Sequence, residues 1–322
     1  MAINRTRRTR SSQTMRDLVS NVNFSLDNLI YPLFIEEGAG IKTEINSMPG
    51  QYRFSIDMLK PELEELKNLG IKSLLIFGIP LKKDECGSEA YNDNGIVQEA
   101  VRYIKKEYPD FLIVTDVCMC EYTSHGHCGI LNGDEVVNDA TVKLLEKIAV
   151  SHAKAGADII APSDMMDGRI AALREALDGA GFIHTPIMSY SVKYSSSYYG
   201  PFRDAADSAP SFGDRKAYQM DFRNSRDYLV EARYDIQEGA DIIMVKPGMP
   251  YLDVVKTISD NIDLPVAVYN VSGEYSMVKA AAEKGWIDEE KIVMENMYAM
   301  RRAGASIIIT YHAKDIAKWM ER

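Results

Sequence analysis

The sequence predicts a (β/α)8 barrel over residues 26–322, preceded by an extended N-terminal arm over residues 1–25. Eight short segments rich in Ile and Val recur along the chain, and most lack the apolar–polar alternation of a strand with one wet face. A Gly-Ala-(Asp/Ser)-Ile-Ile pattern also recurs, in AGADIIAPS, EGADIIMVK and AGASIIITY, where a helical stretch meets an apolar segment. Repetition of one βα unit with eight strand candidates favours a barrel.

The strand candidates lie at residues 28–35, 71–79, 111–117, 157–163, 186–193, 240–246, 265–271 and 306–313. Amphipathic helical stretches lie between several of them, at residues 55–70, 138–156, 167–181 and 274–285. Glycine accepts the left-handed conformation that ends a helix, and it stands before a strand or short loop at Gly70, Gly156, Gly181, Gly239 and Gly304. An open, doubly wound sheet is the alternative, but no glycine-rich phosphate loop follows the first segment.

Composition excludes several classes of protein. With 322 residues, 46% hydrophobic and 26% charged, the chain has the composition of a soluble globular protein. A net charge of −10 argues against nucleic acid as the main partner. No apolar run is long enough to cross a bilayer, and the N-terminus lacks the apolar core of a secretory signal, so we expect a cytoplasmic protein. The Arg- and Ser-rich start is typical either of a transit peptide or of an arm that grips another subunit.

Two lysines close two of the apolar segments: Lys193 ends PIMSYSVK and Lys246 ends DIIMVK. Burial and a neighbouring cation both push a lysine amine toward its neutral, nucleophilic form. Adjacent strands lie about 5 Å apart, so the two amines are expected to meet over one pocket and to lower each other's pKa. This favours imine chemistry on a carbonyl substrate, with two imine-forming lysines or with one activating the other. An ion pair at a strand end is the alternative for either lysine.

Polar residues at the carboxyl ends of barrel strands face the active site. In this sequence the rule selects Asp116, Ser163, Lys193, Lys246, Tyr269, Ser272 and Tyr311.

Three cysteines cluster after the third strand candidate, in DVCMCEYTSHGHCGIL: Cys118, Cys120 and Cys128. Thiolates bind zinc strongly, and three protein ligands leave a fourth position for water or substrate. His125 or His127 would complete a structural four-ligand site, and reduced, unliganded thiols are the other interpretation. Cys86 is isolated in the sequence and is expected to be a partly buried thiol.

Residues 195–222 have no clear helical or strand period and are rich in Ser, Gly and Pro. A long irregular stretch in a compact domain is typical of a functional lid, and a mobile surface loop is the alternative. Aromatic and cationic residues in this segment suit a lid that closes on a carboxylate: Tyr199, Phe202, Arg203, Arg215 and Lys216.

Together these motifs resemble the porphobilinogen synthase (5-aminolevulinate dehydratase) family of tetrapyrrole biosynthesis. The resemblance runs from RTRRTRSSQTMRDLV to IIITYHAKD and includes DVCMCEYTSHGHCGIL, IIAPSDMMDGR, IIMVKPGMPYLD and VAVYNVSGEYSM. It implies a (β/α)8 barrel whose N-terminal arm wraps a neighbouring subunit, usually in a homo-octamer. It also implies a lyase of heme biosynthesis that joins two 5-aminolevulinate molecules into porphobilinogen with loss of two waters.

The resemblance also implies a role for each matching residue. Lys246 would form the imine with the substrate that becomes the propionate side of the product, and Lys193 with the acetate-side substrate. Cys118, Cys120 and Cys128 match the members that use catalytic zinc. The other implied roles are carboxylate binding on the acetate side (Arg203, Arg215, Gln219), carboxylate binding on the propionate side (Ser272, Tyr311), pocket lining (Asp116, Ser163, Tyr269) and allosteric magnesium binding (Glu231).

One departure is visible after GDRKAYQMD, where many members have proline and this chain has Phe222. The departure affects the expected loop path and leaves the chemistry unchanged. Two other functions stay open on the residues. A class I aldolase needs one catalytic lysine and no cysteine triad, and a non-catalytic, chaperone-like zinc protein would not need two lysines with carboxylate-binding arginines.

Overall fold

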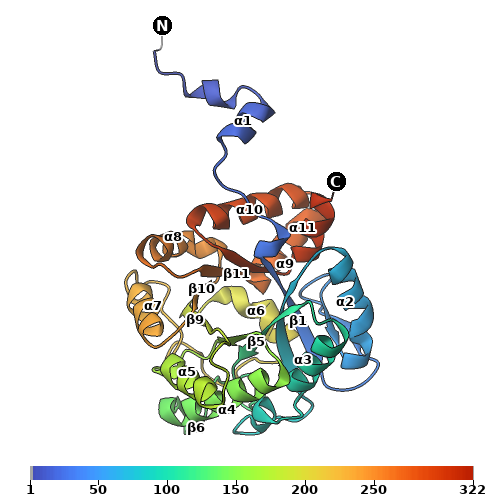
Figure 1. Cartoon of the computed structure of the whole chain (residues 1–322), viewed down its shortest axis with the longest axis vertical. Helices are drawn as coiled ribbons and strands as arrows, with labels where there is room; N and C mark the ends of the chain where they lie inside the picture. Colours follow the sequence, from blue (N-terminus) through green and yellow to red (C-terminus); the bar gives the residue numbers. More distant parts are fainter. Residues whose placement is uncertain (1–2, 322) are drawn as a thin grey trace.

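Eight parallel strands form a barrel in the computed structural model, which describes residues 3–321 (Figure 1). Their hydrogen-bonded order is β8-β5-β4-β1-β12-β11-β10-β9, and a parallel bridge between Ile160 and Ile187 joins the two ends. The strands are β1 (Leu29–Glu36), β4 (Ser73–Ile79), β5 (Leu112–Val117), β8 (Ile159–Pro162), β9 (Met188–Lys193), β10 (Ile242–Lys246), β11 (Val266–Asn270) and β12 (Ile307–Thr310). The predicted barrel is confirmed, and the open sheet is wrong.

Each strand is followed by at least one helix, and the helices surround the barrel (Figure 1). The outer helices are α2 (Leu59–Asn68), α3 (Ile96–Glu107), α4 (Asn138–Ala155), α5 (Arg169–Gly179), α7 (Asp227–Gln237), α8 (Leu252–Asn261), α9 (Ser272–Glu283), α10 (Glu289–Ala303) and α11 (Ala313–Met320). The glycine prediction is confirmed, because all five glycines have positive φ, and Gly156 ends α4 at φ 107° and Gly304 ends α10 at φ 112°. No helix within residues 3–321 is long and apolar enough to span a membrane.

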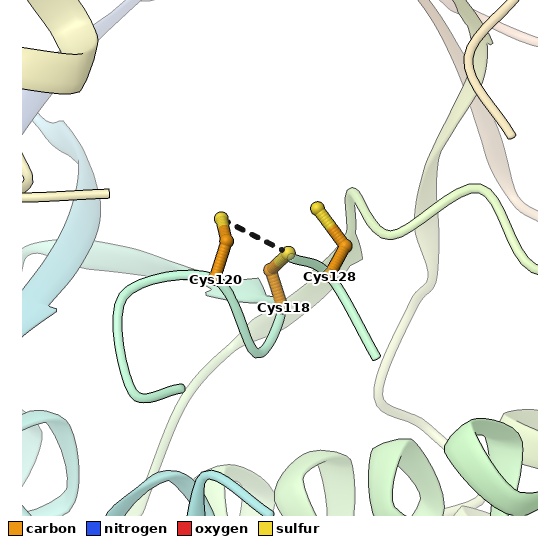
Figure 2. Close-up of side chains that lie close together, drawn as sticks. All are labelled: Cys118, Cys120 and Cys128. Atoms are coloured by element: carbon orange, nitrogen blue, oxygen red, sulfur yellow. Dashed lines mark hydrogen bonds between the residues drawn. The ribbon is translucent and has the colours of Figure 1, made fainter. Parts of the chain in front are cut away.

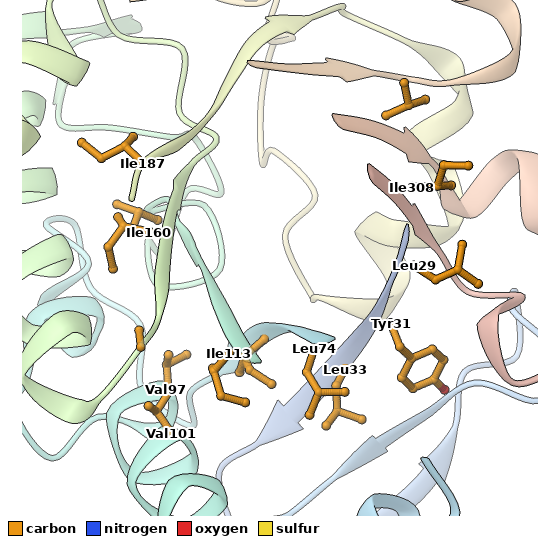
Figure 3. Packing of buried hydrophobic residues seen from close by; sticks show 14 of the residues in the cluster. Leu29, Tyr31, Leu33, Leu74, Val97, Val101, Ile113, Ile160, Ile187 and Ile308 are labelled. Carbon is orange, nitrogen blue, oxygen red and sulfur yellow. The ribbon is translucent and has the colours of Figure 1, made fainter. Parts of the chain in front are cut away.

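The core has two layers, because alternate residues of each strand face opposite sides. On β4, Leu74 and Ile76 pack toward the helices, whereas Leu75 and Phe77 pack inside the barrel. Figure 3 shows the outer layer, where Val97 of α3 lies near strand side chains. Both faces of each strand are buried, which explains why the strand sequences are nearly continuous apolar runs.

The N-terminal arm extends away from the barrel (Figure 1). Within its described part it contains a 3₁₀ helix, η1 (Thr6–Arg10), and a short helix, α1 (Gln13–Val19). Apolar side chains on this arm are exposed, with 88% of Ile3 and 78% of Leu18 accessible. The chain itself therefore leaves apolar surface on the arm uncovered.

The segment at 195–222 is more ordered than its sequence indicates. It contains η5 (Ser197–Tyr199) and α6 (Gly200–Ala205), and a parallel bridge between Tyr194 and Met220 closes its base. The expectation of a wholly irregular stretch is wrong over these helical turns, because Pro201 at the start of α6 is compatible with the first turn of a helix. The structure also has two small antiparallel hairpins that sequence inspection did not predict: β2 (Lys42–Glu44) with β3 (Tyr52–Phe54), and β6 (Leu131–Asn132) with β7 (Glu135–Val136).

Candidate active site

Strands β9 and β10 place Lys193 and Lys246 at paired positions of neighbouring strands. The register shifts between Ile243 and Val245 of β10, so β9 carries one extra residue there, a β-bulge. With strict alternation Lys193 would point opposite to Tyr190, whose side chain packs inside the barrel. The bulge lets both side chains face the interior, where Lys193 and Lys246 line one cavity.

Lys246 has an almost wholly aromatic environment and is only 4% exposed. Its Nζ lies 4.4–5.3 Å from four ring centroids, those of Tyr269, Phe202, Tyr190 and Tyr199. Burial, together with the charge of Lys193, lowers the pKa of Lys246 to about 7. A substantial fraction of this amine is therefore neutral and nucleophilic near neutral pH.

Lys193 has a polar environment, although it is equally buried. Its ammonium donates a hydrogen bond to the carbonyl of Ser163 and lies 5.6 Å from the ring centroid of Tyr190. Burial opposes its charge, but negative charge on Cys128, and then on Cys118, Cys120 and Asp116, outweighs burial and raises the pKa of Lys193. The expectation that both lysines would have lowered pKa values is wrong for Lys193, because the sequence did not show how strongly negative charge would act on it.

Asp116, at the end of β5, interacts electrostatically with both lysines, and its carboxylate lies within 4.8 Å of the Cys118 sulfur. Ser163 donates a hydrogen bond to its Oδ2 over 3.0 Å, while Oδ1 has no hydrogen-bond partner among the described residues. Burial and the charge of Glu121 raise the pKa of Asp116 to about 7, partly offset by the two lysines. An acid group and a basic amine with similar pKa values thus face one cavity, which suits proton transfer near neutral pH.

The three thiols point toward a common position (Figure 2). Their sulfurs lie within 4.8 Å of one another, with 3.4 Å between Cys118 and Cys120, and none of the three residues is more than 3% exposed. Hydrogen bonds from Cys118 and Cys120 hold the pKa of Cys128 well below its ordinary value, and Arg215 and Lys193 add to this shift. Sulfurs bound to one zinc at about 2.3 Å lie about 3.8 Å apart. The donor set and its spacing fit a thiophilic cation.

Two cationic residues of the segment at 195–222, Arg203 and Arg215, line the same cavity, and the segment also carries Gln219. Arg215 is 5% exposed and donates to the carbonyls of Gly126 and Ser208, at 2.8 and 2.6 Å. The Nε atoms of Arg203 and Arg215 and the Nε2 of Gln219 are buried without a hydrogen-bond partner among the described residues. Buried donors without partners are costly, so this group suits a carboxylate ligand.

Of three further predicted residues, Ser272, Tyr269 and Tyr311, Tyr269 lies beside Lys246, with its ring centroid 4.4 Å from Lys246 Nζ. The hydroxyls of Tyr269 and Tyr311 are 2.9 Å apart, and Ser272 Oγ accepts a hydrogen bond from the backbone N–H of Phe202 at 2.9 Å. The serine expected to bind a carboxylate is therefore bonded to α6.

The chain is similar to proteins of one family throughout its length. The model of the family described as Delta-aminolevulinic acid dehydratase matches residues 3–319. A relative of that name from Bacillus subtilis (strain 168) is 54% identical over 319 residues, covering 99% of this chain and 98% of the relative. A second, from Synechococcus elongatus, is 56% identical over 320 residues, with 98% of each chain covered. A solved porphobilinogen synthase from Toxoplasma gondii ME49, in complex with its reaction product porphobilinogen, matches with a TM-score of 0.97 at 46% identity, covering 99% of this chain and 92% of that chain.

The chain belongs to the delta-aminolevulinic acid dehydratase family. This confirms the resemblance and the predicted enzyme class, a hydro-lyase. It also argues against the class I aldolase and the chaperone-like zinc protein as alternatives.

Most residues predicted from the sequence gather around one cavity. It is lined by Asp116, Cys120, Ser163, Lys193, Tyr199, Phe202, Arg203, Arg215 and Lys246, together with Phe77 and Glu121. Its free volume is about 10 Å³, room for about one water. Two 5-carbon molecules do not fit in this space with the side chains as they stand.

Several predicted residues lie elsewhere. Lys216 is exposed and pairs with Asp214 at 2.8 Å. The ring nitrogens of His127 face Tyr218 and the carbonyl of Phe212, and within residues 3–321 neither His127 nor His125 joins the thiol cluster. Cys86, expected to be partly buried, is exposed.

Glu231 lies on α7, half-buried, in a separate groove of about 410 Å³. Four other carboxylate residues line this groove: Asp134, Glu135, Asp167 and Asp214. Burial and the charge of Asp235 raise the pKa of Glu231.

Sequence reasoning missed Tyr190, Glu121 and Phe77. Tyr190 contacts both lysines through its ring face, at 5.6 Å from Lys193 Nζ and 5.1 Å from Lys246 Nζ. Tyr190 lies three residues before Lys193, and on a regular strand the two side chains would face opposite sides of the sheet. The bulge lets both face the barrel interior. Glu121 adjoins Cys120, whose thiol lies 3.2 Å from its Oε2, so inspection of the cysteine motif was the available signal.

Proposed function

We propose that the enzyme condenses two 5-aminolevulinate molecules into porphobilinogen through imines on Lys246 and Lys193. The observation that carries this proposal is the pairing of the two lysines over one cavity that also holds buried, unpartnered carboxylate-binding donors. One such lysine suffices for an aldol cleavage, whereas two anchors suit two copies of a keto acid. The related porphobilinogen synthase from Toxoplasma gondii, solved with porphobilinogen, supports the same assignment.

Lys246 is the better initial nucleophile, because its pKa of about 7 leaves much of the amine neutral. Its amine attacks the ketone carbon of one substrate, and loss of water gives the imine that becomes the propionate side. In this proposal Tyr311 and Ser272 hold the carboxylate of that substrate, after α6 moves and frees the Ser272 hydroxyl.

Lys193 forms the second imine, on the acetate-side substrate, after giving up a proton. Arg203, Arg215 and Gln219 bind the carboxylate of this substrate with their buried, unpartnered donors. Asp116 receives or returns a proton at its Oδ1 beside the two amines. The amino group of one substrate attacks the imine carbon of the other, which forms the C–N bond and displaces that lysine as its amine. A carbon next to the substrate's former ketone loses a proton and attacks the remaining imine carbon, which forms the C–C bond, and elimination then releases the second lysine amine. Two waters leave in total, and both lysines are regenerated.

We assign Cys118, Cys120 and Cys128 as the ligands of a zinc ion. Zinc would act as a Lewis acid toward the acetate-side substrate next to Lys193. The fit rests on three buried sulfurs within 4.8 Å of one another and on the low pKa of Cys128. Three reduced thiols in one site also suit a cytoplasmic location, where disulfides are rare.

We assign the groove around Glu231 as a magnesium site that regulates the enzyme. Magnesium prefers carboxylate oxygens and retained waters, and this groove offers five carboxylate residues around about 410 Å³. We further propose that the N-terminal arm packs on a second copy of the chain, in a homo-octamer. The uncovered apolar side chains of the arm, Ile3, Leu18 and Val19, support this.

A trapping experiment tests the proposal. Borohydride added during turnover of 5-aminolevulinate should reduce both imines, so peptide mass spectrometry should find substrate carbon on Lys246 and Lys193. Porphobilinogen should form in the same mixture before reduction, should cease with a chelator, and should resume with added zinc. Labelling of neither lysine would contradict the imine mechanism, and full activity in the chelator would contradict the zinc assignment.

A further inference from the structure

A buried ion cluster lies directly behind the bulge in β9. Arg169, the first residue of α5, is 2% exposed and faces Asp235 of α7 on one side and Asp164 on the other. The distances are 3.5 Å from its Nη2 to Asp235 Oδ2 and 3.6 Å from its Nε to Asp164 Oδ2. Asp164 is 0% and Asp235 4% exposed, so water screens neither pair.

On its Asp235 side, the cluster contacts β9 where the strand carries its extra residue. Arg169 Nη2 donates to Ser189 Oγ at 3.1 Å and to the carbonyl of Tyr190 at 3.4 Å. Ser189 Oγ in turn donates to Asp235 Oδ2 at 2.6 Å. A bulge leaves backbone groups without ladder partners. Here the Arg169 guanidinium donates a hydrogen bond to the carbonyl of Tyr190, a residue of the bulge.

On its Asp164 side, the cluster adjoins Ser163, whose carbonyl accepts the hydrogen bond from the Lys193 ammonium. Asp164 directly follows Ser163 in the chain. Asp164 Oδ1 accepts from the backbone N–H of Met166 at 2.8 Å, and Arg169 Nη1 donates to the Met166 carbonyl at 3.1 Å. Arg169 therefore contacts both the strand that carries Lys193 and the turn that orients its amine.

We propose that Arg169, Asp235 and Asp164 are positioning residues that aim Lys193 into the barrel by bracing the β9 bulge and the turn after β8. This inference rests on the proposed function, because it needs Lys193 to form an imine. A cluster that only stabilised the fold would not need ions, since apolar residues of similar volume stabilise a core equally well or better. Ions that fix one geometry through several directed bonds suit an aiming role.

Within residues 3–321, no buried ion pair of this kind contacts the end of β10 that carries Lys246, so Lys246 serves as an internal reference. The turn after Lys246 is held by Glu274, whose carboxylate accepts from the backbone N–H groups of Met249 at 2.6 Å and Val271 at 2.7 Å. Loss of the Arg169 cluster should therefore disturb Lys193 and leave Lys246 in place. The ratio of substrate trapped on the two lysines of one sample reports that difference.

The test compares borohydride trapping of 5-aminolevulinate in the wild type, Asp235→Asn and Ser189→Ala. Asp235→Asn keeps the shape and removes the charge, whereas Ser189→Ala removes one hydroxyl and leaves all three ions. We expect the Lys193-to-Lys246 label ratio to fall about tenfold in Asp235→Asn and by a smaller factor in Ser189→Ala, as for other supporting-shell changes. Circular dichroism and thermal melting identify folded variants. If Asp235→Asn does not fold, Ser189→Ala decides.

Glu62→Gln is the matched control. Glu62 is 5% exposed and accepts from Lys314 at 2.6 Å, and it contacts β1, which lies across the barrel from β9. Its label ratio should equal that of the wild type even if its melting temperature falls.

The outcomes separate the two proposals. A wild-type ratio in a folded Asp235→Asn, or in Ser189→Ala where that variant decides, overturns the positioning role and leaves the proposed function intact. A fall in the ratio of equal size in Glu62→Gln also overturns it, since any lost buried charge would then suffice. Absence of label on Lys193 in the wild type overturns the second imine and this inference together.

Discussion

Lys246 and Lys193 occupy paired positions on neighbouring strands and are equally buried, yet their surroundings have opposite effects. Lys246 faces four aromatic rings, and its pKa falls to about 7. Lys193 faces a carbonyl, Asp116 and three thiols, and its pKa rises. Burial alone would lower both pKa values. The comparison teaches that nearby charge, and not depth in the barrel, decides which lysine is the ready nucleophile.

The largest expected effect comes from removing the readier nucleophile. Lys246→Met should lower kcat/KM for porphobilinogen formation by about 10⁴-fold or more, because no other neutral amine replaces it. Initial rates with 5-aminolevulinate measure the loss. Lys256→Met, at an exposed lysine that pairs with Asp260, is the control and should retain wild-type activity. Equal activity of the two variants would show that Lys246 is not the nucleophile.

The next effect concerns the three cysteines whose charge acts on Lys193. Changing Cys118, Cys120 and Cys128 together to Ala should abolish zinc binding and lower kcat by about 10²–10³-fold, the contribution of a Lewis acid of several kcal/mol. Metal analysis and rate assays measure the two losses. Borohydride labelling of Lys246 should persist, since its aromatic surroundings are unchanged. Cys86→Ala, at the exposed cysteine, is the control. Unchanged activity in the triple variant would remove zinc from the mechanism.

A smaller effect distinguishes Lys246 from Asp116, because both have a pKa of about 7. Below pH 7 the rate of imine trapping on Lys246 should rise about tenfold per pH unit, as the amine loses its proton, and should level above it. In Asp116→Asn this rise in trapping rate should occur at a pH lower by about half a unit to one unit, because the lost carboxylate had raised the pKa of Lys246. If the pH dependence of the trapping rate instead disappears in Asp116→Asn, the titrating group is Asp116 and not Lys246.

The smallest effect is on stability, and it should have opposite signs at the two lysines. In the unfolded chain both lysines titrate near their ordinary pKa, so between pH 7 and that value the unfolded state holds a proton that Lys246 lacks in the fold. Stability should therefore increase with pH in this window, and Lys246→Met should stabilise the protein at pH 6 by about 1–3 kcal/mol.

The raised pKa of Lys193 gives the reverse sign: its stabilisation is complete below its unfolded pKa and is lost only as pH rises through the folded value. Lys193→Met should destabilise the protein at pH 6 by about 1–3 kcal/mol. Chemical denaturation of metal-free protein measures both changes, with Lys256→Met as the neutral reference. The same sign at both lysines would refute the contrast between their surroundings.

Much of this protein is determined by local sequence. The eight apolar segments, the recurring Gly-Ala-Asp-Ile-Ile pattern and the glycines that end helices predicted the barrel, because strand burial and helix termination depend on neighbouring residues. The rule that strand ends face the site then selected both lysines and Asp116 from the sequence alone. The cysteine motif predicted the thiol cluster, because its three members are close in the chain.

Only the tertiary structure decided what depends on distant residues. The bulge in β9 interrupts the regular alternation of side chains between the two faces of the strand. The sequence therefore could not place Tyr190 beside the lysines. Arg169 meets its two carboxylates from a different helix and loop, and no spacing rule joins them. The opposite pKa shifts of Lys193 and Lys246 arise from charges and rings brought together by folding. Electrostatic energy depends on distance and burial in space, which the order of residues does not specify.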